Sequence, residues 1–139
     1  MKTETASRPI PASPERWHDA DDIRWAARQW AARIGVPLRS ITLRPMSRKW
    51  ASISTAGRLT LDTALLDLDR DLGEFVVVHE LVHLLCPGAG HGRVFTSFMA
   101  AYLPDWTERL SRLDAITQAL PGSVRGGAAN SDPKINRRT

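Results

Sequence analysis

Apolar residues recur at helical spacing in the first third of the chain and predict an amphipathic helix. Its apolar stripe consists of Ile23, Ala26, Ala27, Trp30 and Ile34. Gly35-Val36-Pro37 is a strong helix-ending signal. The sequence leaves two possible starts for this helix. Ser13-Pro14 could provide a cap and a first-turn proline, or an aspartate at position 19, 21 or 22 could cap a later start.

The next region predicts three short strands. They are Ser40 to Arg44, Lys49 to Ser54, and Arg58 to Leu61. Thr55-Ala56-Gly57 is a tight connection, so we expect the last two strands to pair as a hairpin.

A buried helix is predicted from Leu72 to Leu85, because this run is apolar almost all round. Asp69 or Asp71 could cap its start, and Cys86-Pro87-Gly88 ends it.

Two amphipathic helices should follow. The apolar stripe of the first is Phe95, Phe98, Met99 and Tyr102, and that of the second is Trp106, Leu110, Leu113 and Ile116. Pro104 separates them, and Asp105 with Glu108 reads as a capping box for the second helix.

This order of elements predicts one α+β domain over residues 14–120, within the length expected of a single domain. Residues 1–13 are polar and contain proline, and residues 121–139 lack apolar periodicity and are basic. We expect both ends to be disordered tails.

The composition favours a soluble, cytoplasmic protein. No apolar run is long enough to span a membrane, and the N-terminus lacks the apolar core of a signal peptide. The single cysteine, Cys86, excludes an internal disulfide framework. These observations predict no membrane partner and do not indicate an oligomeric state.

The net charge of +4 is unevenly distributed. Between Ile23 and Leu61 there are eight basic residues and no acidic one. Such a segment, together with the basic C-terminal tail, could contact nucleic acid or an acidic partner, or could be an ordinary solvated surface.

The predicted buried helix carries the motif His79-Glu80-Leu81-Val82-His83. Residues four apart on a helix lie on one face, so His79 and His83 can both direct a ring nitrogen to one metal ion. Glu80 is then placed to take a proton from a water without ligating the metal. Imidazoles and a carboxylate are costly to bury alone, and a zinc ion would satisfy them.

A catalytic zinc site needs a third protein ligand, and His91 is our first choice because a glycine-containing turn can bring it back to the other two histidines. Cys86 is about 10 Å along the helix axis from His79, too far for one ion to bridge. Asp105 and Glu108 remain alternatives, although helix capping already explains them.

These residues, with several flanking blocks, resemble the YgjP-like zinc metallopeptidases, a family related to the SprT-like and WLM groups. The matching blocks are Trp50-Ala51-Ser52, Arg58 to Leu61, Val76 to Leu84, His91 to Phe95, and Leu103 to Trp106. The resemblance implies a zincin-like α+β fold, with His79, His83 and His91 as zinc ligands and Glu80 as the catalytic residue. The family usually has W-G-S-C where this chain has Trp50-Ala51-Ser52-Ile53, a change that touches none of these ligands.

The leading hypothesis is therefore a zinc-dependent peptidase with Glu80 as general base and no other cofactor. Tyr102 and Arg93 are the local side chains that could stabilise the oxyanion, and an extended peptide could pair with the strand at 49–54. One alternative is a SprT/WLM-like protease acting on DNA-bound proteins. The other is a zinc-stabilised binding module without turnover.

Overall fold

The computed structural model describes residues 16–88 and 90–120. The predicted tails and the Ser13-Pro14 cap lie outside these residues. None of the helices within them combines the length and the apolar character that a membrane span requires.

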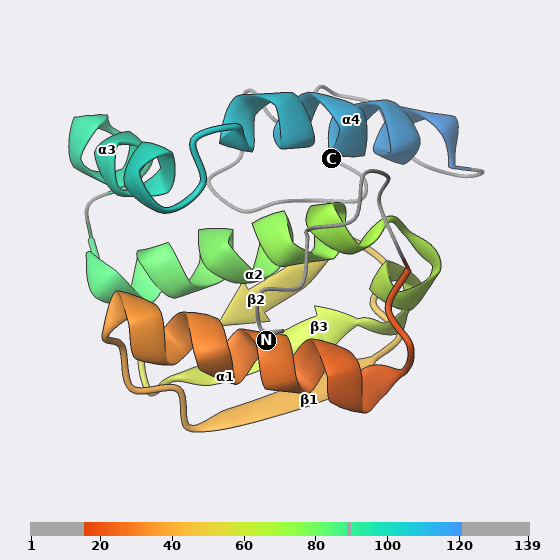
Figure 1. The fold of residues 1–139 in the computed structure, drawn as a ribbon, viewed down its shortest axis with the longest axis horizontal. Coiled ribbons are helices and arrows are strands. Elements are labelled where there is room, and N and C mark those ends of the chain that lie inside the picture. Colours follow the sequence, from red (N-terminus) through yellow and green to blue (C-terminus); the bar gives the residue numbers. More distant parts are fainter. Residues whose placement is uncertain (1–15, 89, 121–139) are drawn as a thin grey trace, which may run out of the picture.

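The described chain forms a small sheet covered by helices (Figure 1). In chain order the elements are α1 (Ala20–Ile34), β1 (Ser40–Arg44), β2 (Ala51–Ile53), β3 (Arg58–Asp62), the 3-10 helix η1 (Thr63–Asp67), α2 (Arg70–Leu85), α3 (Arg93–Tyr102) and α4 (Trp106–Ala119). This is the predicted α+β order, with an N-terminal helix and sheet before the motif helix and two further helices.

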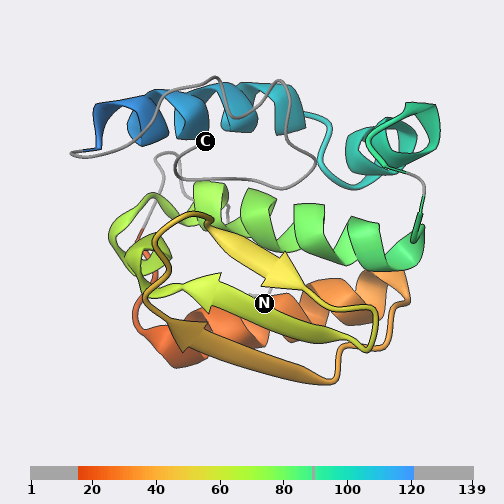
Figure 2. The ribbon, with the colours of Figure 1, turned by 180° about the vertical axis from the view of Figure 1, so that it is seen from behind.

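The sheet has the order β1-β3-β2, so the last strand in sequence lies in the middle. β2 and β3 pair antiparallel, which confirms the predicted hairpin, and β1 pairs parallel with β3. The strand predicted at 49–54 is shorter in the structure, where β2 spans Ala51–Ile53. Figure 2 shows the side of the sheet that the described helices leave uncovered.

Helix α1 begins at the later of the two predicted starts. The Asp19 carboxylate accepts a hydrogen bond of 2.9 Å from the backbone N–H of Asp22 and caps the helix. Gly35 ends the helix at φ 87°, in the left-handed region that favours glycine. The predicted stripe is buried, so it is core packing.

Helix α2 runs through the centre of the fold and packs against α1, β2, α3 and α4. This position explains its apolar sequence, because almost every face meets another element. Gly73 lies where the buried Trp17 indole crosses the helix: a Cβ at this position would come within 2.5 Å of Trp17 Nε1.

Two other carboxylates predicted as helix caps, those of Asp69 and Asp105, have a different role. Neither Asp69 nor Asp105 makes a side-chain capping bond, so the predicted capping box is wrong. The Asp105 carboxylate accepts a hydrogen bond from Arg109 on the next turn. Asp69 lies 3.4 Å from Arg112, so its charge helps to join α2 to α4.

Candidate metal centre

Three histidines from two parts of the chain meet beside α2. Each of His79, His83 and His91 offers one ring nitrogen, and these nitrogens all lie within 4.8 Å of one another. His79 and His83 are one turn apart on α2, with ring centroids 4.7 Å apart. The turn after α2 brings His91 back, so that its Nε2 lies 2.9 Å from Nε2 of His83.

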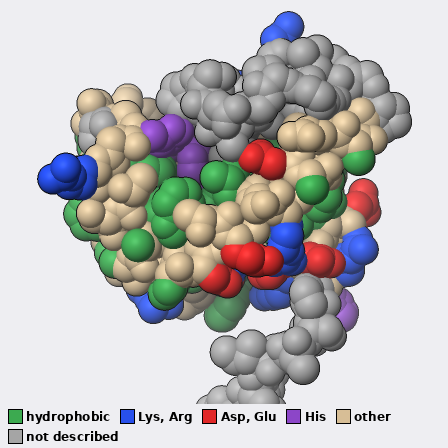
Figure 3. Space-filling view, turned by 90° about the horizontal axis from the view of Figure 1, so that it is seen from above, with side chains coloured by type: hydrophobic (Ala, Val, Ile, Leu, Met, Phe, Trp, Pro, Cys, Tyr) green, Lys and Arg blue, Asp and Glu red, His purple; other side chains and the backbone are tan. Residues whose placement is uncertain are grey.

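The cluster is open to solvent on one side and buried on the other. His79 is buried, His83 is half-buried and His91 is exposed. Figure 3 shows histidine side chains at the surface next to apolar side chains, whereas acidic and basic side chains gather elsewhere on this face. A ligand could therefore reach the histidines from solvent.

Glu80 lies next to the cluster inside the fold. It is 0% exposed, and its Oε2 is 3.3 Å from Nδ1 of His79. A neutral His79 that carries its proton on Nδ1 can donate to this carboxylate, and its Nε2 then keeps the lone pair that a metal requires.

The donor set suits a metal ion. Two nitrogens bound to one zinc at about 2.0–2.1 Å with tetrahedral angles are about 3.3 Å apart. The 2.9 Å between the Nε2 atoms of His83 and His91, and the limit of 4.8 Å for the whole set, are close to this spacing. Small side-chain movements would therefore be enough to place three nitrogens around one cation.

The other residues considered as third ligand are engaged elsewhere. The Cys86 thiol donates to the carbonyl of Val82, and burial raises the pKa of this thiol, which disfavours the thiolate that metals bind. The Asp105 and Glu108 carboxylates form ion pairs with Arg109 and Arg112 on α4.

The two predicted oxyanion-stabilising residues have different surroundings. The Tyr102 ring packs edge-on against Trp30 of α1, with centroids 6.5 Å apart. Within the described residues, Tyr102 makes a ring contact with this tryptophan and with none of the histidines. Arg93 is exposed at the start of α3, immediately after the turn that carries His91. Because Arg93 lies close to His91 along the chain, it is favoured over Tyr102 as the residue that stabilises the oxyanion. This role stays a prediction for both residues.

Phe95 is the residue that the sequence pattern did not single out for the site. Its ring centroid lies 5.3 Å from that of His79 and 4.6 Å from those of both His83 and His91. It belongs to the predicted apolar stripe of α3, and only its position four residues after His91 could have suggested this contact.

The basic residues between 23 and 61 are spread over several elements. On α1, Arg24 pairs with Asp21, and Arg33 lies over the Trp30 ring. Arg44, Arg48 and Lys49 instead line a pocket at the end of the sheet. The contact with nucleic acid stays a prediction.

Comparison with known proteins agrees with this geometry. A family model described as YgjP-like, metallopeptidase domain, matches residues 13–116. No curated protein sequence matches the chain.

Two crystal structures share the fold. The metallopeptidase zymogen of Pyrococcus abyssi abylysin is 23% identical over 69% of this chain and 95% of that chain, with a TM-score of 0.62. The metallopeptidase zymogen of Methanocaldococcus jannaschii jannalysin is 22% identical over 70% and 97%, with a TM-score of 0.60.

At this level of identity the two structures support the fold, while the family model identifies the kind of protein. The model covers residues 13–116, which include all of the described helices and strands except the last residues of α4. The chain is thus a metal-dependent peptidase and belongs to the YgjP-like metallopeptidase domain family.

Proposed function

We propose that the chain hydrolyses peptide bonds with zinc held by His79, His83 and His91 and with Glu80 as general base. The observation that carries the proposal is the meeting of three imidazole nitrogens within 4.8 Å, beside a buried carboxylate. Three histidines with an open side match a catalytic zinc site, which leaves one position for water or substrate.

Zinc, when bound, supplies a Lewis acid that lowers the pKa of a coordinated water toward about 7. Glu80 would accept a proton from the attacking water and pass it to the leaving amine. Glu80 is buried beside His79, so its carboxylate is already at the site, and it would turn from Nδ1 of His79 toward the metal side of the ring to take this proton.

β2 is the strand on which a peptide substrate could bind. It is an edge strand of the sheet and packs directly against α2, which carries two of the three histidines. An extended peptide can add to such an edge through backbone hydrogen bonds, and these would hold the scissile bond near α2.

Glu80→Gln tests the assigned base. The amide is close to the carboxylate in size but cannot accept the proton, so peptide cleavage should fall by about 10²- to 10⁴-fold. Zinc content by elemental analysis should stay at the wild-type level, because Glu80 is not one of the ligands.

Glu108→Gln is the matched control, since it makes the same chemical change at an exposed residue of α4. It should leave cleavage unchanged. Wild-type cleavage in Glu80→Gln would rule out Glu80 as the base, and zinc-loaded wild type that cuts no peptide would favour a binding module without turnover.

A further inference from the structure

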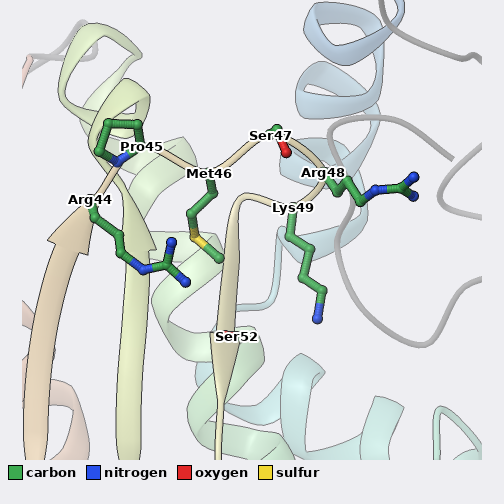
Figure 4. Close-up of a pocket in the computed structure, with 7 residues that line it drawn as sticks. All are labelled: Arg44, Pro45, Met46, Ser47, Arg48, Lys49 and Ser52. Atoms are coloured by element: carbon green, nitrogen blue, oxygen red, sulfur yellow. The ribbon is translucent and has the colours of Figure 1, made fainter.

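A second polar site lies at the end of the sheet, in the connection between β1 and β2. A pocket of about 440 Å³ is lined there by residues 44–49 and by Ser52 of β2. Figure 4 shows the Arg44 and Lys49 side chains on either side of Met46, while Arg48 extends away from them. Three cationic residues thus line one open pocket, with Arg44 and Lys49 close to Met46 and Arg48 directed away from them.

These cations are not neutralised within the described residues. Arg44, Arg48 and Lys49 form no ion pair with a described carboxylate, whereas Arg109 and Arg112 on α4 each pair with at least two. The pocket is therefore a concentration of positive charge next to the neutral hydroxyl of Ser52. An anionic group is the ligand that this charge favours.

The connection that carries the cations is held at both ends. The backbone N–H of Met46 donates to the buried Asp62 carboxylate over 3.4 Å. The Trp50 indole donates to Thr117 of α4 over 3.1 Å in the core. These two hydrogen bonds tie the connection to the rest of the domain, which reduces the ordering entropy that would be lost when a ligand binds.

The pocket also has a defined place relative to the metal centre. β2 and α2 run in the same direction, and the β1–β2 connection lies at the end where α2 begins (Figures 1 and 2). A peptide paired antiparallel to β2 runs the opposite way, so its C-terminal part leads toward the pocket.

The length of α2 between its start and the histidines gives the distance from the pocket to the metal centre. This distance can be expressed as a number of residues of an extended peptide. His79 and His83 follow the start of α2 by 9 and 13 residues, which is about 14–20 Å at 1.5 Å per residue. An extended peptide covers this length in roughly four to six residues at about 3.3 Å each.

On the basis of the proposed function, we propose that Arg44, Arg48 and Lys49 form a specificity subsite for acidic side chains of the peptide substrate. The acidic residues lie on the C-terminal side of the scissile bond, about four to six residues away. The enzyme accordingly prefers peptides with an acidic segment at that place over peptides with the corresponding amides.

Binding can be measured without turnover in full-length, zinc-loaded Glu80→Gln. Three fluorescent peptides share one apolar segment: one has Asp and Glu on its C-terminal side, one has Asn and Gln there, and one has the acids on its N-terminal side. The first should bind about three- to tenfold more tightly than the other two, as expected for a few partly exposed ion pairs. This preference should decline as salt is raised.

Arg44→Glu and Lys49→Glu, each in the same background, should abolish the preference while zinc content and melting temperature stay at the parent level. Arg28→Glu is the control, because Arg28 is exposed on α1 and the charge change is the same. An unchanged preference in both pocket variants overturns the subsite. A single-stranded oligonucleotide that binds through Arg44 and Lys49 more tightly than the acidic peptide would assign the pocket to nucleic acid instead.

Cleavage by the wild type separates this proposal from the proposed function. Suppose that the wild type cuts the peptide with Asn and Gln, and that it binds and cuts the peptide with Asp and Glu no better than this neutral one. Then only the subsite is wrong. If no peptide is cut while the acidic preference is present in binding, the proposed hydrolysis fails and the subsite stands.

Discussion

At the scale of single residues, the proposed metal centre depends on packing as much as on the three histidines. Phe95 is 2% exposed and contacts all three histidine rings, so it limits the positions that the imidazoles can take. Residues that orient metal ligands in this way usually contribute to metal affinity although they do not touch the ion.

Phe95→Leu should therefore weaken zinc binding by about tenfold, because the smaller side chain leaves the rings freer to rotate. The measurement is a competition titration of zinc against a chelator of known affinity. Phe98→Leu is the matched control, since Phe98 lies on the same helix, half-buried, and makes no ring contact with the histidines. Equal zinc affinity in Phe95→Leu and the wild type would show that the ring has no positioning role.

Part of this cluster could be predicted from the sequence because the spacing is short, while the metal-binding and catalytic roles of its residues stay predictions. His79, Glu80 and His83 lie within one helical turn, so helix geometry alone brings them together. His91 required a turn whose path the sequence does not specify, and the structure now places it beside the others. Phe95 could not be recognised, because an apolar residue in a helical stripe looks the same whether it faces the core or a site.

At the scale of elements, α2 is held in place by charged side chains at its start. Arg112 of α4 donates to both carboxylate oxygens of Asp71, over 2.8 and 2.9 Å. Arg109 donates to Glu74 of α2 over 2.8 Å. The hydrogen bond with Arg112 is the main reason that the pKa of Asp71 is lowered from its ordinary value.

Asp71→Asn should destabilise the protein by about 1–2 kcal/mol at pH 7, because the amide keeps the shape of Asp71 but loses its charge. A lowered pKa means that the carboxylate stabilises the fold above its ordinary pKa of 3.8. This stabilisation is lost as the pH falls through the lower pKa of the folded state. The difference from wild type in urea unfolding should therefore shrink below about pH 4.

Asp67→Asn is the control, because Asp67 is exposed and has no ion pair within the described residues. Asp67→Asn should be as stable as the wild type both at pH 7 and below about pH 4. If Asp71→Asn and Asp67→Asn unfold alike at pH 7, the ion pair with Arg112 contributes nothing to stability.

The elements themselves were more predictable than their ends and partners. The apolar stripe of α1 and the alternation in β1 matched the structure, because each repeats the period of its own element. The capping box at Asp105 was wrong, since an arginine one turn further along offers its carboxylate a charged partner. The parallel pairing of β1 with β3 could not be predicted, because alternation indicates a face of a strand and not its neighbour.

At the scale of the whole molecule, one buried helix organises both proposed sites. The histidines lie toward the end of α2, and the basic pocket lies at the end of the sheet where α2 begins. β2 connects the two along the edge of the sheet. The α+β class could be predicted from the order of elements, but this relation between the sites depends on the strand order β1-β3-β2.

The most direct test of the proposed function is the zinc content of the purified wild type and of His91→Ala, measured by elemental analysis after dialysis against a zinc buffer. Loss of one of three ligands should cost most of the affinity, so we expect one zinc per wild-type chain and little or none in the variant. His18→Ala is the control, because His18 is exposed at the start of α1 and does not belong to the cluster. One zinc retained in His91→Ala, or none in the wild type, would contradict the three-histidine site.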